Sequence, residues 1–156
     1  MPHQALRREW QPGHNVCTVI WRRSETTGII ELLTVRSRTT FRGKTTVWRI
    51  KFPGGGQEGP KEPIEGTRDR EVWQETHLSF MKSEQIWINP VNPEHTRYGY
   101  LVAETDCSGE LRRDFLKEGD DELESPLWKD ASTLYLELYE KHQALLLAAL
   151  RKLGLA

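Results

Sequence analysis

Two glutamates one helical turn apart, directly after an arginine, are the residues of this chain best spaced to do chemistry. Glu71 and Glu75 are four residues apart, and Arg70 precedes the first of them. On a helix, residues four apart share one face with Cβ atoms about 5 to 6 Å apart, so both carboxylates can reach one cation. Mg²⁺ prefers oxygen ligands and often binds together with phosphate groups. The segment is therefore predicted to bind Mg²⁺ or Mn²⁺ beside a phosphate-containing small molecule.

A glycine-rich turn stands just upstream of these carboxylates. Residues 52 to 56 read Phe-Pro-Gly-Gly-Gly. Because glycine has no side chain, such a turn lets the backbone and a phosphate group approach each other closely. Gly55 and Gly56 are therefore expected to contact the substrate.

The turn, the acidic helix and the arginine together resemble the Nudix box. The family pattern is Gly, five residues, Glu, seven residues, Arg-Glu, an aliphatic residue, any residue, Glu-Glu, any residue, Gly and an aliphatic residue. The residues that match in register are Gly56, Glu62, Arg70, Glu71, Val72, Glu75 and Leu78. Gln74 replaces the first of the paired glutamates, and His77 replaces the glycine. Seven matches at fixed spacing are far more specific than a single glycine motif. The resemblance also covers residues 48 to 55, Trp128 and a leucine-rich segment near the end.

This resemblance implies a fold and an activity. The expected fold is α/β: a single Nudix domain over residues 1–156, an α/β/α sandwich with a mixed sheet between helices. The expected activity is metal-dependent hydrolysis of a pyrophosphate bond in a nucleoside diphosphate linked to another group. In the family, Glu71 and Glu75 would bind the metal, and Glu62 with Arg70 would form an ion pair that orients the loop against the helix. Family members often pair as dimers, so the resemblance allows a homodimer.

The two departures from the pattern leave alternatives open. The amide oxygen of Gln74 can bind Mg²⁺ but brings no charge, so the metal site would be weaker. His77 stands where a left-handed helix ending is expected, at a cost of about 1 kcal/mol for a residue other than glycine. Both changes favour the alternative of a weakened or non-enzymatic Nudix-fold module that binds a nucleotide or a protein. Two further readings are an unrelated α/β protein and a helix whose charges form only exposed ion pairs.

Charged residues outside the box are candidates for the same site. A further carboxylate often approaches the metal in this family, and the acidic residues 120–124 are the place to expect it. Glu122 is the preferred ligand, followed by Glu124, although a solvent-exposed acidic loop is an equally plausible reading. Arg42 and Arg49 are expected to contact the substrate, although the basic segment around Arg42 is equally compatible with a loop that binds no phosphate.

Two residues near the other end of the chain bear on chemistry and substrate. His142 lies on an apolar helical stripe and is expected to be a core histidine without a catalytic role. Pro93 stands about fifteen residues after the box, as in some Nudix enzymes that cleave ADP-ribose. The resemblance therefore weakly favours a substrate like ADP-ribose.

Composition limits the class of protein. A chain of 156 residues suits one hydrophobic core, and a formal net charge of −1 argues against capture of duplex nucleic acid. Cys17 and Cys107 have no metal-ligand spacing and are expected to be reduced, buried thiols. The sequence shows no apolar stretch fit for a signal peptide or a membrane span, so a cytoplasmic protein is expected.

Periodicity and turn residues place the elements that must position the site. Strands are predicted at residues 16–23, 28–35, 47–52, 84–89 and 96–106, with the first two forming a hairpin. Residues 36–46 are predicted to be a mobile loop. Helices are predicted at residues 64–76 and 134–153, the second closed by Gly154. This order predicts a mixed sheet between helices.

Overall fold

The computed structural model describes residues 13–156. Residues 1–12, in which the sequence shows no signal peptide pattern, lie outside the described part. The strands of its large sheet are β1 (Gly13–Arg23), β2 (Ile30–Phe41), β3 (Lys44–Thr45), β4 (Arg49–Lys51), β5 (Gly54–Gly56), β7 (Glu84–Asn92), β8 (His95–Ala103), β10 (Leu116–Glu118), β11 (Asp121–Leu123) and β12 (Leu127–Asp130). A small second sheet pairs β6 (Ser79–Phe80) with β9 (Cys107–Ser108). The helices are α2 (Ile64–Thr76) and α3 (Gln143–Lys152), and the short 3₁₀ turns are η1 (Glu104–Asp106), η2 (Leu134–Leu136) and η3 (Glu140–His142).

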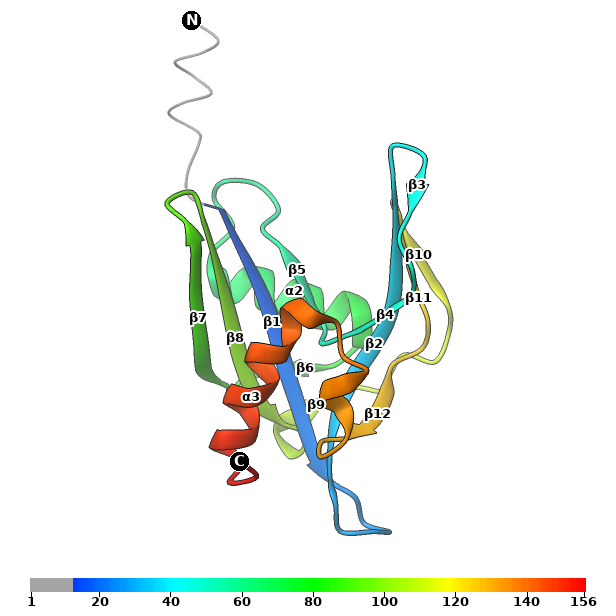
Figure 1. Ribbon diagram of the computed structural model, residues 1–156, viewed down its shortest axis with the longest axis vertical. Coiled ribbons are helices and arrows are strands. Elements are labelled where there is room, and N and C mark those ends of the chain that lie inside the picture. Colours follow the sequence, from blue (N-terminus) through cyan, green and yellow to red (C-terminus); the bar gives the residue numbers. More distant parts are fainter. Residues whose placement is uncertain (1–12) are drawn as a thin grey trace, which may run out of the picture.

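The large sheet is mixed and lies between the two helices. Its main path runs β10–β11–β2–β1–β8–β7. Strands β1 and β8 are parallel, whereas the other neighbours on this path are antiparallel. Figure 1 shows α3 in front of the sheet and α2 behind it. The predicted α/β/α sandwich is therefore confirmed.

Two apolar cores attach the helices to the sheet. Val19 and Ile20 are neighbours on β1 and point to opposite faces, because side chains alternate along a strand. Val19 lies in the core that includes Leu145 of α3, and Ile20 lies in the core that includes Val72 of α2. Full burial of one such side chain contributes roughly 1.5 to 3 kcal/mol. The sheet is therefore held from both faces.

The strands β1 and β2 separate above their shared hairpin, and this separation makes room for the site. Their pairing covers only the stretch from Trp21 opposite Leu32 to Arg23 opposite Ile30. Farther along, β1 pairs with β5 and β8, whereas β2 pairs with β4 and β11. The two groups of strands diverge as two walls, with α2 behind the gap (Figure 1).

The predicted mobile loop at residues 36–46 is wrong. β2 continues to Phe41, and the chain then turns through Arg42 and Gly43 into β3. Both turn residues have positive φ, 51° and 77°, which suits a tight hairpin whose twist matches that of its strands. The polar composition hid this strand because its outer half carries polar side chains on both faces and ends in the exposed residues Thr40 and Phe41.

The predicted single helix at residues 134–153 is also wrong. The segment forms η2 and η3 before α3 begins at Gln143. Between the two short turns, the Tyr139 N–H donates to the Ile50 carbonyl at 2.8 Å, which pulls the chain off the helical path towards β4. The expected end is present, because Gly154, which follows the C-cap residue Leu153, has a φ of 73°.

Most other predicted elements are present, with shifted ends. The helix at residues 64–76 has the predicted bounds, and the first two strands form the predicted hairpin. The break predicted at residues 89–93 is smaller than expected, because β7 runs on to Asn92 with a register shift after Pro90. The strand predicted to reach Asp106 ends at Ala103 and is followed by η1.

Cys17 and Cys107 are free thiols and only partly buried. No helix within residues 13–156 has the length and apolar character needed to cross a membrane.

Candidate active site

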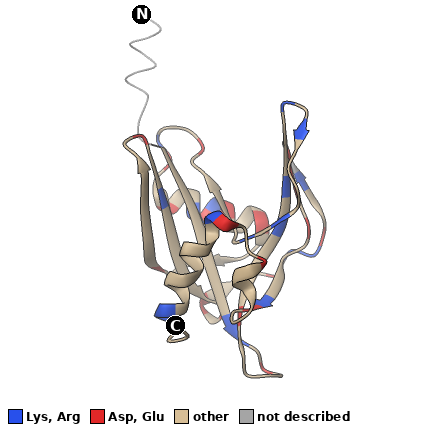
Figure 2. Cartoon of the chain, in the orientation of Figure 1, with Lys and Arg blue, Asp and Glu red and all other residues tan. Residues whose placement is uncertain are grey.

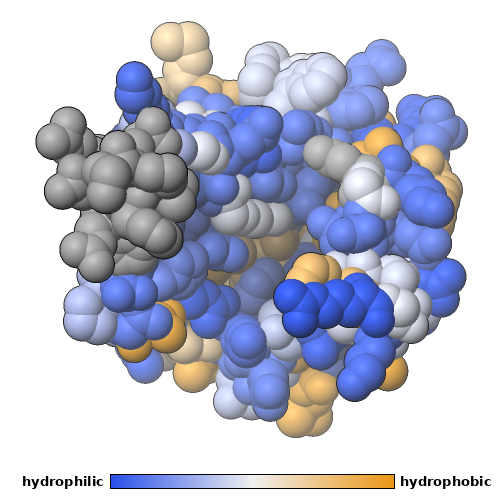
Figure 3. Space-filling view, turned by 90° about the horizontal axis from the view of Figure 1, so that it is seen from above, coloured by the Kyte–Doolittle hydropathy of each residue, from blue (hydrophilic) through white to orange (hydrophobic). Residues whose placement is uncertain are grey.

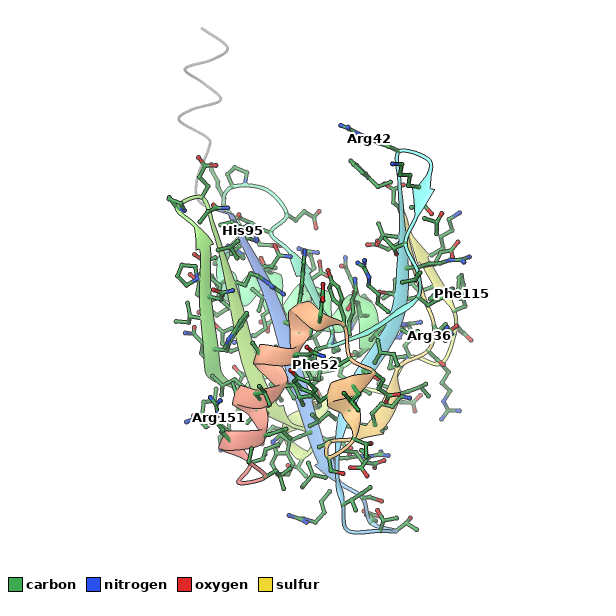
Figure 4. The ribbon with its side chains drawn as sticks, viewed as in Figure 1. Arg36, Arg42, Phe52, His95, Phe115 and Arg151 are labelled. Atoms are coloured by element: carbon green, nitrogen blue, oxygen red, sulfur yellow. The ribbon has the colours of Figure 1, made fainter. Side chains whose placement is uncertain are left out.

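A cavity of about 540 Å³ lies between the two walls. Gly54, Gly55 and Glu75 line one part of it, and Asn15 and Cys17 of β1 line another. Seen from above, the surface is hollowed between the walls (Figure 3). In Figure 4, Arg42 stands at the hairpin tip and His95 on the facing wall. Phe52 lies deeper between them (Figure 4).

The carboxylates of Glu71 and Glu75 both lie against the glycine turn. One Glu75 oxygen accepts a hydrogen bond from the Gly54 N–H at 3.0 Å. A Cβ atom added to Gly55 would lie 2.5 Å from a Glu71 carboxylate oxygen, so a larger residue there would displace this carboxylate. Burial, followed by the negative charge of Glu71, raises the pKa of Glu75 to about 8. The two predicted ligands are thus brought together, with repulsion between them.

The ion pair between Glu62 and Arg70 ties the loop to α2. Arg70 Nε and Nη2 donate to the two Glu62 carboxylate oxygens at 2.8 and 3.0 Å. Arg70 also donates to Glu71 at 2.9 Å and to the Gly56 carbonyl at 2.9 Å. The side chains of Arg70 and Glu62 are only 22% and 16% exposed. The guanidinium therefore fixes the turn and one predicted ligand in a single set of bonds.

A buried histidine supports the same ion pair from the sheet side. The Thr67 hydroxyl donates to Glu62 at 2.5 Å and lies 2.6 Å from His14 Nε2. Because an ionised carboxylate only accepts, the hydroxyl proton points to Glu62 and His14 Nε2 donates to Thr67. The hydrogen bond from Arg70, followed by that from Thr67, lowers the pKa of Glu62 to about 2. His14 and Thr67 gave no signal in the sequence.

Glu62→Gln is expected to lower the free energy of unfolding by about 2 to 3 kcal/mol at pH 7. The pKa of Glu62 is lowered to about 2, so its charge stabilises the fold fully above the ordinary value of 4.5. That contribution disappears as the pH falls towards 2, so the difference between variant and wild type should shrink between pH 7 and pH 3. Urea denaturation at both values measures it. Glu58, 72% exposed and 3.2 Å from the same arginine, supplies the control Glu58→Gln, with a loss below about 0.5 kcal/mol. An equal loss for Glu62→Gln at both pH values would contradict this account.

The two residues that depart from the family pattern both lie next to the site. The Gln74 side-chain oxygen accepts a hydrogen bond from Arg70 Nη1 at 3.2 Å. His77 ends α2 with a φ of 64°, the left-handed conformation in which the family has glycine, and its ring stacks on Trp73 at 5.2 Å. His77 thus adopts the strained backbone expected at this position, at a cost of about 1 kcal/mol.

The acidic stretch at residues 120–124 reaches the cavity through a different residue from the one predicted. Asp121 and Leu123 line the cavity, so the alternation of β11 turns Glu122 to the other side. There Glu122 accepts from Arg38 at 2.5 Å, and Glu124 pairs with Arg36 at 2.9 Å. The alternation of side chains along β11, which separates Asp121 from Glu122, was the signal that the sequence analysis missed.

The residues predicted to contact substrate are spread over the region. Gly55 lines the cavity, whereas Gly56 is exposed and presents its carbonyl to Arg70. Arg42 lies at the exposed hairpin tip with its guanidinium over Phe41. Arg49 lies over the Tyr139 ring at 4.5 Å, beside the cavity but not among its lining residues.

Basic residues that the sequence did not single out line the cavity. Lys51, two residues after Arg49 on β4, faces inward, as do Arg97 of β8 and Lys141 of η3. Figure 2 shows basic residues along β2 and its hairpin, and both acidic and basic residues on α2. The cavity lining therefore carries both acidic and basic side chains, although the net charge of the chain is close to zero.

His142 is a buried histidine, as predicted, and it contacts the cavity wall. Its Nδ1 accepts from the Phe52 N–H at 3.1 Å, and its ring stacks on that phenyl ring. Burial, followed by the charge of Lys51, lowers the pKa of His142 to about 3. Its Nε2 lies 3.5 Å from Cys17 Sγ, and burial raises the pKa of that thiol to about 12. Both groups are therefore neutral at pH 7, and they do not form a thiolate–imidazolium pair.

Within residues 13–156, no three His, Cys, Asp or Glu side chains are gathered closely enough to hold a metal ion by themselves. The donors at the turn are two carboxylates and the amide of Gln74, which suits a hard cation that keeps several water molecules. Mg²⁺ and Mn²⁺ fit this description better than a fully protein-bound ion such as structural Zn²⁺.

Comparisons with solved structures place this arrangement among known folds. No family model and no curated protein sequence matches the chain. A MutT NUDIX hydrolase from Burkholderia pseudomallei is 21% identical with a TM-score of 0.62, covering 87% of this chain and 96% of its own. The NUDIX domain of NrtR from Shewanella oneidensis, solved in complex with ADP ribose, is 16% identical with a TM-score of 0.65, covering 98% and 99%. A mutT/nudix family protein from Listeria innocua is 13% identical with a TM-score of 0.65, covering 92% and 95%. The chain has the Nudix fold.

Proposed function

We propose that this protein is a Mg²⁺- or Mn²⁺-dependent hydrolase of a pyrophosphate bond in a nucleoside diphosphate linked to another group. The observation that carries the proposal is the pair Glu71 and Glu75 against Gly54 and Gly55, beside the cavity. Arg70 already pairs with Glu71, whereas Glu75 forms no ion pair among the described residues, so a further cation between the two carboxylates would stabilise the charged form of Glu75. Burial, followed by the charge of Glu71, raises the pKa of Glu75 to about 8, and a bound cation would offset both effects.

Each part of the site would have a separate task. Glu71 and Glu75 would hold the metal with the Gln74 amide, and Asp121 is better placed than Glu122 to add a carboxylate from across the cavity. A divalent ion supplies a more acidic bound water and neutralises charge on the phosphates.

The chain's own groups would hold the substrate in place. Lys51 acts electrostatically on Glu75 and faces the cavity, so its ammonium group would bind the pyrophosphate. The bare backbone of Gly54 and Gly55 would let the phosphates approach. Arg70 would hold the glycine turn in a fixed position against α2. The ADP ribose bound to the NrtR domain supports a small nucleotide of that kind as the substrate.

The second candidate function is a Nudix-fold module that binds a nucleotide without cleaving it. Gln74, His77 and the lack of three gathered ligands in the described chain favour it. A screen of dinucleotides, nucleotide sugars and nucleoside triphosphates with Mg²⁺ or Mn²⁺ separates the two. Release of a nucleoside monophosphate or of phosphate is expected from at least one compound. Metal-dependent binding of a nucleotide without product would support the module instead.

Gln74→Glu is expected to raise the affinity for Mn²⁺ by about fivefold or more, because it adds a negative charge beside Glu71. Coulomb attraction at a partly exposed site favours the divalent ion by roughly 1 kcal/mol, against smaller repulsion among the carboxylates. Titration calorimetry of both proteins measures the change. Gln85→Glu on β7, whose residue does not line the cavity, adds the same charge elsewhere and should leave the affinity unchanged. Unchanged affinity in Gln74→Glu would mean that position 74 does not face the metal.

A further inference from the structure

Two basic residues of the cavity lining have no carboxylate partner in the described chain. They are Arg97 on β8 and Lys141 on η3. Neither of them forms an ion pair within residues 13–156. Arg97 is half-buried, and a half-buried cation without a partner is unfavourable, so Arg97 with the exposed Lys141 beside the same cavity favours an anionic ligand.

A row of polar side chains crosses the cavity floor at Arg97. The strand registers place Gly56, Asn15, Arg97 and Asn89 side by side on β5, β1, β8 and β7. The side chains of Asn15, Arg97 and Asn89 all face the cavity. Within the described chain, neither amide makes a side-chain hydrogen bond, so both keep donors and acceptors for a ligand.

Arg97 is oriented by contacts that leave part of its guanidinium free. Its Nη2 donates to the Lys141 carbonyl at 3.0 Å, and the group lies 5.6 Å from the Trp87 ring centre. An arginine held on one side can present its remaining N–H groups as a pair to a phosphate or carboxylate. The bond to the Lys141 backbone also brings the second cation to the same place.

The distance between the two charged regions indicates what the anion is. The backbone of Arg97 lies two strand spacings, about 10 Å, from that of Gly56, the residue after Gly55, which lies against Glu71. That span exceeds one pyrophosphate group but suits two phosphate groups with a ribose between them. Lys51, which acts electrostatically on Glu75, would bind the pyrophosphate.

We propose that Arg97 and Lys141, with the amides of Asn15 and Asn89, form a subsite for a second phosphate group, carried on the ribose next to the pyrophosphate. The ligand class is a nucleotide with both a pyrophosphate and a ribose phosphomonoester. The orientation of this ligand rests on the proposed function, because metal at Glu71 and Glu75 defines where the pyrophosphate binds.

NADPH and NADH test this subsite, because they differ only by a 2′-phosphate on the adenosine ribose. Titration calorimetry with Ca²⁺ in place of Mg²⁺ measures binding of each. The wild type is expected to bind NADPH about tenfold more tightly or better. Arg97→Met should abolish the preference and leave NADH affinity within about threefold, and Arg97→Lys should restore part of it. Arg151→Met, at the exposed end of α3 (Figure 4), is the control and should keep the full preference.

The outcomes separate this subsite from the proposed hydrolysis. The subsite is overturned if the wild type binds NADPH and NADH with equal affinity. It is also overturned if Arg97→Met lowers the affinity for both compounds by the same factor. If Arg97→Met melts much earlier than the wild type, Lys141→Met, whose side chain makes no hydrogen bond in the described part, must itself lower the preference. A preference for NADPH that depends on Arg97, without hydrolysis of NADPH, NADH or any compound of the screen in Mg²⁺ or Mn²⁺, would uphold the subsite and refute the hydrolase. Hydrolysis of another nucleotide without any effect of the 2′-phosphate would refute the subsite alone.

Discussion

Glu75→Gln is expected to reduce turnover of any substrate found in the screen by about a thousandfold or more. The change removes a ligand charge at nearly constant shape, and the amide oxygen can still accept the Gly54 N–H. Loss of a metal-activated water costs several kcal/mol of barrier, and each 1.36 kcal/mol is about tenfold in rate. Steady-state rates at matched Mg²⁺ concentrations measure it.

A control variant makes this loss specific. Glu84→Gln removes the same charge from an exposed carboxylate that pairs with Lys152 on the far edge of the sheet. Its turnover should stay within about twofold of the wild type. Full activity of Glu75→Gln at the same metal concentration would show that Glu75 is not a metal ligand.

The same substitution is expected to stabilise the metal-free protein. The pKa of Glu75 is raised from 4.5 to about 8, so the folded state holds a proton that the unfolded state releases between these values. The wild type therefore loses stability as the pH rises through this window, at up to about 1.4 kcal/mol per pH unit. Solvent access to a half-buried carboxylate reduces this slope. Glu75→Gln removes the effect, and we expect a gain of about 2 to 3 kcal/mol at pH 8.5.

Urea denaturation in EDTA at pH 5.5 and pH 8.5 measures this gain. The gain should be small at the lower pH, where Glu75 is mostly protonated in the fold. Saturating Mg²⁺ should raise the stability of the wild type but not that of the variant, because binding to the native state alone stabilises it. Destabilisation by Glu75→Gln at pH 8.5 in EDTA would show that Glu75 is a stabilising structural ion.

The parts of the site inside the box could be predicted because they depend on local spacing. Helical geometry and the fixed pattern identified Glu71, Glu75 and the Glu62–Arg70 pair, and the structure forms that pair. The helix had weak apolar periodicity, so the motif, and not the hydrophobic pattern, located it. The left-handed end at His77 followed from the same pattern.

The parts contributed by other segments could not be predicted because they depend on strand register. Arg97 reaches the cavity through its pairing with β1, and no local feature of residues 95–103 shows this. Asp121 and Glu122 have nearly equal local signals, and only the facing direction of β11 separates them. The long helix predicted from Leu134 failed because a tertiary bond from Tyr139 to β4 outweighs helical periodicity.

The position of bound Mn²⁺ tests the central claim most directly. Crystals of this protein soaked in millimolar Mn²⁺ should show an anomalous peak between the carboxylates of Glu71 and Glu75, beside the glycine turn. The same soak of Glu75→Gln crystals should lose that peak or weaken it strongly. A peak elsewhere in the wild type, with both carboxylates free of metal, would contradict a metal-dependent active site at this turn.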